Sequence, residues 1–437
     1  MKSRLIATQR NVHHGLVAME HTLEVPLDYA RPDGDSITVF ARELVTASNE
    51  KRDVPYLAWF QGGPGNRAER PATVSGWLKK ALESYRVILM DQRGTGLSSL
   101  INRTTLADQG GPGEQADYLS KFRADAIVND AEQIRQLVTT GDRWSILGQS
   151  YGGFIALTYL SFHPEGLREV FITGGLPTMT GSPDDVYTLT YQQTAKRCDE
   201  FFAVYPGSNE RAWEIFEHLQ NEEEHLQTGE RFTPERFQTL GIQLGTASGF
   251  WQLHYQLESA FVDTCKGKRL SDYFLSEVSG VVSFAKNPLY ALLQEAIYTH
   301  GEATRWSAHR IRERFPEFAL SRTRVDGPFR FTGEMVYPWQ FEQDSALVPL
   351  RAAAEELATM AGLPALYEEE VLASNDVPIA AAVYYEDMFV PRQISLDTAD
   401  KVRGIQLLIT NEYQHDGIRQ DGEQLLSKLM KALQPIR

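Results

Sequence analysis

The sequence predicts an α/β fold in which helices flank a mostly parallel sheet and a long helical segment interrupts that sheet. Short apolar runs alternate with helical patterns in the first part of the chain. Strand-like runs return only near its end. Since 437 residues are more than one compact core usually needs, we expect two domains or one domain with a large insertion.

The elements of the first part follow from their own patterns. Runs with β-type composition predict strands at 16–26, 36–45, 54–60 and 86–91. Apolar side chains recur at helical spacing between Ala126 and Val138, which predicts a helix at 125–138. Buried strands are expected at 144–147 and 169–174. This order of strand, helix and strand favours parallel pairing.

The remaining chain changes character twice. Long helical patterns with many aromatic residues, among them Trp213, Trp251 and Trp339, run from about 178 to 372 and predict an inserted helical domain. Strand character returns at 379–384 and 405–410, and an amphipathic helix is expected at 421–433. The predicted units are therefore residues 1–177 and 373–437 as the core, and residues 178–372 as a helical cap.

The composition excludes several classes of function. The 43 basic and 58 acidic residues give a net charge of −15 without a basic cluster, so nucleic acid is not an expected partner. No apolar leader or 18-residue apolar run is present, which predicts a cytoplasmic protein without membrane contact. Cys198 and Cys265 are expected as small buried side chains, and Glu222–Glu224 beside His225 as a solvated helix face. No metal and no cofactor is implied.

The segment Gly148-Gln149-Ser150-Tyr151-Gly152 carries the main chemical signal. It joins the predicted strand at 144–147 to an apolar helical run. A serine on such a strand-to-helix turn is held in a strained conformation that exposes its hydroxyl, and the glycines avoid steric clashes there. The following helix N-terminus favours developing negative charge. Ser150 is therefore the predicted nucleophile.

A serine nucleophile needs a base and an orienting carboxylate. His415 follows the predicted strand at 405–410, and Asp387 follows the one at 379–384. Because the carboxyl ends of parallel strands meet at one edge of a sheet, we expect both side chains near Ser150. Two neighbouring carboxylates stay open as alternatives, Glu386 in place of Asp387 and Asp416 as an orienting group.

Backbone amides are expected to stabilise the oxyanion of an acyl-transfer intermediate. One is the amide of Tyr151, and the others are those of Gly62 and Gly63 in the glycine loop, residues 61–65, which follows the strand at 54–60. A phosphate-binding loop is the alternative interpretation. The segment lacks the lysine and hydroxyl of that motif.

These motifs together resemble the proline iminopeptidases, which are serine peptidases with the α/β-hydrolase fold. The resemblance rests on Gly62-Gly63-Pro64-Gly65, on Asp91-Gln92-Arg93-Gly94-Thr95-Gly96-Leu97-Ser98 and on Gly148-Gln149-Ser150-Tyr151-Gly152-Gly153. The cap resembles that of the longer bacterial form. Gln61 stands where shorter relatives carry histidine, which matters little if only backbone groups form the oxyanion hole. The resemblance implies a serine exopeptidase that releases N-terminal proline from short peptides through an acyl-enzyme.

The resemblance also extends to two cap segments, Leu289–Glu295 and Thr332–Trp339. It implies that Glu295 and Glu334 bind the charged imino nitrogen of the substrate, because a buried cation must be paired. Glu302 is a third candidate. Trp306, Tyr337 and Trp339 are candidates for the wall of the proline-ring pocket.

Other functions stay open beside this one. An aminopeptidase with a broader preference for the first residue, or an esterase or amidase of the same fold, would use the same triad. A binding protein on a hydrolase scaffold would not need it. Epoxide hydrolases and haloalkane dehalogenases of this fold require an aspartate where Ser150 stands. The sequence fixes neither the oligomeric state nor the preferred peptide length.

Overall fold

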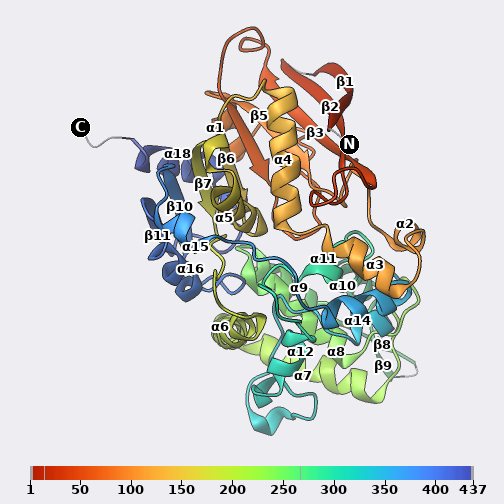
Figure 1. Cartoon of the computed structure of the whole chain (residues 1–437). Helices are drawn as coiled ribbons and strands as arrows, with labels where there is room; N and C mark the ends of the chain where they lie inside the picture. Colours follow the sequence, from red (N-terminus) through yellow and green to blue (C-terminus); the bar gives the residue numbers. More distant parts are fainter. Residues whose placement is uncertain (1–2, 14, 266, 435–437) are drawn as a thin grey trace.

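The computed structural model describes residues 3–13, 15–265 and 267–434, and Figure 1 shows a sheet with its helices above a helical region. In these residues nine strands form the main sheet, in the order β1-β2-β3-β5-β4-β6-β7-β10-β11. The strands are β1 Arg4–His13, β2 Leu16–Pro26, β3 Ser36–Thr46, β4 Tyr56–Phe60, β5 Arg86–Asp91, β6 Trp144–Gln149, β7 Leu167–Thr173, β10 Ile379–Tyr384 and β11 Ile405–Thr410.

The sheet is antiparallel from β1 to β5 and parallel from β5 to β11. The strands β6 and β10 are buried along their whole length, as expected for parallel strands covered on both faces. The prediction of a mostly parallel sheet is confirmed. Because β4, β6, β7, β10 and β11 run in one direction, the loops after their carboxyl ends lie along a single edge.

Helices cover both faces of the sheet. The helices α1 (Gly76–Leu82), α17 (Gly417–Gln420) and α18 (Gly422–Ala432) lie on one face, where Trp59 stacks on Trp77 with ring centroids 4.2 Å apart. The helices α4 (Ala124–Val138) and α5 (Tyr151–Phe162) lie on the other. Alternate residues of β4 point to opposite faces of the sheet. Leu57 and Trp59 face α1, whereas Ala58 and Phe60 face α5.

A helical region follows β7 and ends before β10, and Figure 1 places it below the carboxyl edge of the sheet. Its helices are α6 Pro183–Val204, α7 Pro206–Asn221, α8 Pro234–Gln238, α9 Gly249–Glu258, α10 Asp272–Val282, α11 Pro288–Leu293, α12 Ser307–Arg312, α13 Gln340–Gln343, α14 Arg351–Thr359 and α15 Glu369–Ala373. Aromatic side chains such as Phe201, Trp213 and Phe331 form its own core. The predicted unit boundaries at 177 and 372 stay predictions.

The core and the helical region also share hydrophobic contacts. Leu289, Tyr337 and Leu357 belong to the same buried cluster as Ile155 of α5. Three short helices outside the helical region complete the chain, namely α2 Arg103–Ala107, α3 Pro112–Ser120 and α16 Arg392–Ala399. Within the described ranges, no helix combines the length and the apolar character needed to cross a membrane.

Four local features differ from the sequence-based expectation. The strand β1 was not predicted, because its residues 4–12 are exposed and mix polar with apolar side chains, and it pairs with β2 alone. A hairpin of β8 (Phe261–Thr264) and β9 (Gly267–Leu270) interrupts the helical region, and it leaves Cys265 exposed rather than buried. The helix α7 ends at Asn221, and Glu224 is buried, where it accepts hydrogen bonds from His218 (2.7 Å) and from the amide of Leu270 (3.1 Å).

Candidate active site

Ser150 stands between β6 and α5 in a conformation that few residues adopt. Its φ of 55° and ψ of −122° lie in a region that is costly for a residue with a side chain. Such strain persists only where the surroundings impose it. Here the amide of Ser150 donates to the carbonyl of Thr173 (3.0 Å), and its carbonyl accepts from the amide of Gly153 (2.7 Å).

Two glycines allow other backbone segments to approach this turn. A Cβ atom on Gly152 would lie 1.9 Å from the carbonyl oxygen of Phe60, so any side chain there would push β4 away from α5. A Cβ atom on Gly62 would lie 3.0 Å from Cβ of Ser150. The glycine loop therefore packs directly beside Ser150.

His415 and Asp387 form a buried hydrogen-bonded pair. Nδ1 of His415 lies 2.7 Å from Oδ2 of Asp387, and Oδ1 of Asp387 accepts from the amides of Phe389 (2.9 Å) and Val390 (3.0 Å). With both of its oxygens occupied, the carboxylate has one fixed orientation. The proton of the neutral imidazole then lies on Nδ1, which leaves Nε2 free to accept another.

The turn after β7 connects this pair to Ser150. Thr173 at the end of β7 accepts the hydrogen bond from Ser150, and a Cβ atom on the next residue, Gly174, would lie 3.3 Å from Nδ1 of His415. The fold thus brings Ser150, His415 and Asp387 together at the carboxyl edge of the sheet.

The two alternative carboxylates have other partners. Glu386 accepts hydrogen bonds from Gln193 (3.2 Å) and Lys196 of α6. Asp416 accepts from the amide of Ala247 (3.0 Å) and from the side chain of Gln420 (2.6 Å). Neither is bonded to the imidazole, which pairs with Asp387.

The electrostatic surroundings favour a protonated His415 more than water does. Burial of the ring lowers its pKa, but the charge of Asp387 and the hydrogen bond to it outweigh this effect, and Glu334 adds a further negative charge. The net result is a pKa above the ordinary 6.5. A base whose pKa is raised in this way can accept a proton and return it in a later step.

The amides of Gly62, Gly63 and Tyr151 are unused donors. In the part of the chain that the structure describes, none of the three donates a hydrogen bond to protein. Gly62 and Tyr151 are nevertheless buried. Because buried amides are nearly always paired, free ones beside Ser150 are suited to receive a negatively charged oxygen.

Glu334 of the helical region lies beside the same site. Its Oε1 accepts a hydrogen bond from the Tyr290 hydroxyl (2.7 Å), and the preceding Gly333 packs against Met388, the neighbour of Asp387. Burial raises the pKa of Glu334 to about 7, although His415 and the Tyr290 hydroxyl favour its ionised form. A partly buried carboxylate without a salt-bridge partner in the described residues is prepared to pair with a cation.

Three tyrosines surround Glu334, and the sequence analysis named none of them for this role. Tyr290 donates to it, and the pKa values of Tyr187 and Tyr298 are raised first by burial and then in part by its charge. Tyr187 and Tyr298 pack edge to face with ring centroids 6.1 Å apart. The hydroxyl of Tyr187 is buried and has no hydrogen-bond partner among the described atoms. The tyrosine wall, defined as Tyr187, Tyr290 and Tyr298, thus places aromatic rings and an unpaired hydroxyl near Glu334, and Tyr187 and Tyr298 are buried.

Glu295 is buried near the tyrosine wall but has its own partners. One of its oxygens accepts from the amide of Ser307 (2.9 Å) and the other from the amide of Ala308 (2.8 Å), at the start of α12. Burial raises its pKa, while these two amides lower it. Its charge contributes to the raised pKa of Tyr187. Glu295 therefore holds the start of α12 in place.

The other predicted binding residues have contacts away from Ser150. Glu302 is exposed and bonds to the amide of His300 in its own loop (3.3 Å). Trp306 donates to Glu355 (3.0 Å) and packs on Phe341. The hydroxyl of Tyr337 is 2.8 Å from that of Tyr191, and its ring stacks on Trp339. The structure does not bring these residues to the triad.

Arg123 holds the segment that carries Tyr298. It donates to the carbonyls of Ala296 (2.9 Å), Thr299 (2.6 Å) and Pro364 (3.1 Å), and it is fully buried. A side chain of the core thereby positions the backbone on both sides of Tyr298.

Among the described residues, no group of three metal-binding side chains is close enough to hold an ion.

The comparisons with known proteins first define the class. A sequence profile of the family described as alpha/beta hydrolase fold matches residues 59–271, which include the glycine loop and Ser150. The sheet order and the turn at Ser150 agree with this fold, so the chain is a hydrolase-fold enzyme.

Two relatives then define the family. A proline iminopeptidase of Aeromonas sobria is 44% identical over 418 residues, which cover 95% of this chain and 96% of the relative. One of Aspergillus aculeatus is 36% identical over 95% of this chain and 92% of its own length. The chain belongs to the proline iminopeptidase family. A solved proline iminopeptidase structure from Mycobacterium smegmatis is 12% identical with a TM-score of 0.44, covering 94% of this chain and 97% of that one, and the assignment rests on the two sequence relatives.

Proposed function

We propose that this enzyme is a serine exopeptidase that releases N-terminal proline from short peptides. Ser150 attacks the carbonyl carbon of the first peptide bond while Nε2 of His415 takes its proton. The amides of Tyr151, Gly62 and Gly63 stabilise the oxyanion. His415 then protonates the departing amine, which leaves a prolyl ester on Ser150, and water hydrolyses this ester by the same steps.

The observation that carries the proposal is the partly buried carboxylate of Glu334, which has no salt-bridge partner among the described residues. A triad alone serves esterases, amidases and peptidases equally, so it identifies no substrate. The imino nitrogen of an N-terminal proline is a cation one carbon away from the scissile carbonyl. Glu334 lies beside the His415–Asp387 pair, and no cation among the described residues neutralises it. It therefore supports recognition of a substrate with a free, charged N-terminus.

The tyrosine wall supports recognition of the ring. A pyrrolidine ring is compact and apolar, and aromatic faces provide contact area with little loss of side-chain entropy. The unpaired Tyr187 hydroxyl and the unpaired Oε1 of Gln294 supply polar atoms next to this surface. Glu295 is proposed to contribute a second negative charge from behind the wall while it fixes α12. Trp306 and Tyr337, which the sequence also suggested, would contribute through the packing of the cap, whereas the exposed Glu302 is expected to have no part in binding.

Glu334→Gln should lower kcat/KM for prolyl naphthylamide by about 10- to 150-fold, because a hydrogen bond to a charged group is worth about 1.5 to 3 kcal/mol. The loss on a neutral nitrophenyl ester should be much smaller.

The pH profile of the Glu334→Gln variant adds a second measurement. His415 must be neutral to act as base, and the charge of Glu334 raises its pKa. Removing that charge lowers this pKa, so the acid limb of ester hydrolysis should move to lower pH.

Glu302→Gln is the matched control, since it neutralises an exposed carboxylate of the same region. It should leave both substrates and the pH profile as in the wild type. Equal losses of Glu334→Gln on the prolyl substrate and the ester would favour an esterase or amidase instead. Full activity of the wild type on other aminoacyl naphthylamides would favour a broader aminopeptidase.

A further inference from the structure

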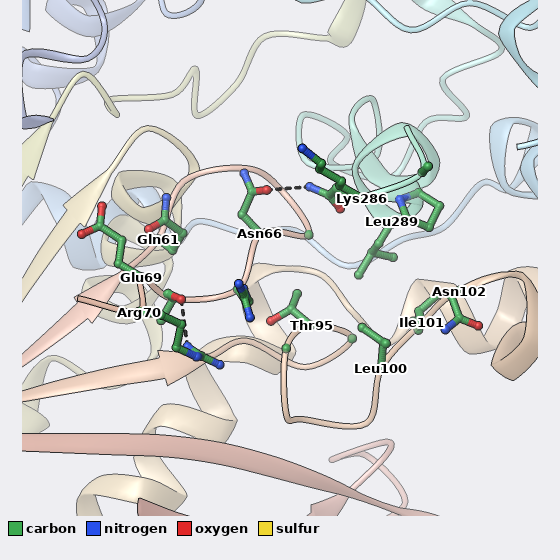
Figure 2. Close-up of a pocket in the computed structure, with 18 of the residues that line it drawn as sticks. Gln61, Asn66, Glu69, Arg70, Thr95, Leu100, Ile101, Asn102, Lys286 and Leu289 are labelled. Atoms are coloured by element: carbon green, nitrogen blue, oxygen red, sulfur yellow. Dashed lines mark hydrogen bonds between the residues drawn. The ribbon is translucent and has the colours of Figure 1, made fainter. Parts of the chain in front are cut away.

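A large groove opens beside the glycine loop and is separate from the tyrosine wall. Its volume is about 1000 Å³, and it lies where the core meets the cap. Figure 2 shows Asn66 of the core facing Lys286 and Leu289 of the cap, with Thr95, Leu100 and Ile101 on the opposite side. The reaction steps described above use none of these side chains.

The charge of the groove is opposite to that of the whole protein. Four basic residues and one acidic residue line it, in a chain with a net charge of −15. Arg70 is already paired with Asp91 in the core, and Arg419 lies 3.8 Å from Glu69. Arg67 and Lys286 are exposed, and neither makes an ion pair or a hydrogen bond with another described residue. Two cations are thus free to bind an anion.

Hydrogen bonds hold the backbone segments that carry Arg67 and Lys286 in place. Asn287, next to Lys286, donates to the side chain of Asn66 (2.7 Å) and to the carbonyl of Pro64 (3.3 Å). These bonds join the start of α11 to the glycine loop and its neighbour Asn66, the residue before Arg67. The two cations therefore lie on segments that are tied to each other across the boundary between core and cap.

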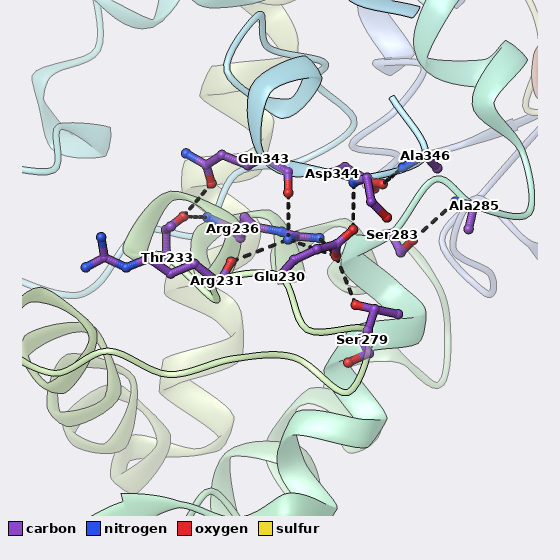
Figure 3. A network of polar contacts seen from close by, with 12 residues as sticks. Glu230, Arg231, Thr233, Arg236, Ser279, Ser283, Ala285, Gln343, Asp344 and Ala346 are labelled. Carbon is purple, nitrogen blue, oxygen red and sulfur yellow. Dashed lines mark hydrogen bonds and ion pairs between the residues drawn. The ribbon is translucent and has the colours of Figure 1, made fainter. Parts of the chain in front are cut away.

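A polar network inside the cap holds the segment just before Lys286 in place. Asp344 accepts from the amide of Phe284 (2.7 Å), two residues before Lys286. Figure 3 shows Asp344 next to the network in which Arg236 bonds to Glu230 (3.2 Å) and to the carbonyl of Gln343 (3.3 Å). The backbone just before Lys286 is thus held by the cap, while the Lys286 side chain is exposed.

One end of the groove lies next to segments of the candidate active site, although Ser150 and His415 do not themselves line it. Gln61 and Gly65 of the glycine loop line it, and so does Arg419 of α17, which begins two residues after His415. The charge of Arg419 opposes the rise in the pKa of His415, so the two side chains are in electrostatic range. Because His415 protonates the departing amine, the groove starts where the departing half of the substrate lies. The tyrosine wall would hold the other half.

We propose that this groove binds the departing part of the peptide and that Arg67 and Lys286 pair with its C-terminal carboxylate. The inference rests on the proposed function and adds to it the recognition of the far end of the substrate. A prolyl peptide carries one charge at each end. Glu334 would pair with the cation and the groove would pair with the anion, an arrangement that would favour short peptides over long chains.

The test compares peptides that differ only at the C-terminus. Pro-Gly, Pro-Gly-Gly and Pro-Gly-Gly-Gly would be assayed as free acids and as amides, and the ratio of the two kcat/KM values would be measured for each length. In the wild type this ratio should exceed one for at least one length and should fall at high salt. Each of Arg67→Gln and Lys286→Gln should lower the ratio about 2- to 5-fold, and the double variant about 4- to 25-fold, as for exposed ion pairs.

Lys51→Gln serves as the control, because Lys51 is an exposed cation before β4, at the opposite edge of the sheet. It should keep the wild-type ratio. A ratio near one at every length in the wild type, or an unchanged ratio in the double variant, would overturn the inference. Proline release from the amides depends only on the proposed exopeptidase activity. Its absence would refute that activity and this inference together, whereas its presence with equal ratios would refute the groove alone.

Discussion

Ser150→Ala should lower kcat on prolyl naphthylamide about a million-fold, because the acyl-enzyme route is lost with the hydroxyl. The protein should remain folded. The backbone of Ser150 is held at a φ of 55° by its own hydrogen bonds and by the close packing of Gly152, and alanine has the same steric demands there. Circular dichroism and the thermal midpoint would verify the fold, and a fluorophosphonate probe should no longer label the variant.

His415→Ala should have nearly the same effect, and the double variant should be scarcely worse than either single one. This non-additivity follows because nucleophile and base act in one step. A Ser150→Ala variant that retained several per cent of the wild-type kcat would contradict the assignment of the nucleophile. So would a double variant with a far larger loss than the single variants.

Asp387→Asn should lower kcat about ten-thousand-fold by fixing the wrong imidazole tautomer. The amides of Phe389 and Val390 donate to one side-chain oxygen of Asp387, so an asparagine would keep its oxygen there and turn its NH₂ group toward His415. Nδ1 would then have to accept, and the proton would move to Nε2, where it blocks the attack of Ser150.

Glu386→Gln is the matched control for this variant. Glu386 is the adjacent carboxylate, and it pairs with Lys196 and Gln193 rather than with the imidazole. Its replacement should change kcat little. If Glu386→Gln were the more damaging of the two, the orienting acid would have to be reassigned to Glu386. Steady-state kinetics at the pH optimum of the wild type provide the comparison.

The sequence predicted best those parts of the fold whose residue pattern follows from their local surroundings. The strands β4, β6 and β10 are short apolar runs because both of their faces are covered, and this shows in the sequence. The turn at Ser150 needs glycines in fixed positions for steric reasons. By contrast, β1 has no apolar pattern, since its order comes from pairing with β2 rather than from burial.

The cap shows the limit of such predictions. Tyr187 and Tyr298 come together from segments more than a hundred residues apart, and no local pattern separates them from core aromatics such as Tyr337. The sequence suggested Glu295 and Glu334 alike for the substrate cation, yet in the structure backbone amides donate to the carboxylate of Glu295, whereas Glu334 accepts from the Tyr290 hydroxyl. Which of the two carboxylates receives backbone hydrogen bonds depends on where α12 begins in space, and tertiary packing determines that position.

The proposed activity depends most directly on a free N-terminal proline, so the decisive measurement compares prolyl naphthylamide with its N-acetylated form and with a panel of other aminoacyl naphthylamides. We predict rapid release of free proline from the first substrate and slow cleavage of the acetylated one, which lacks the cation that Glu334 would bind. The other aminoacyl substrates should be poorer. Equal cleavage of the free and acetylated prolyl substrates would contradict the exopeptidase assignment, even if every triad variant behaved as expected.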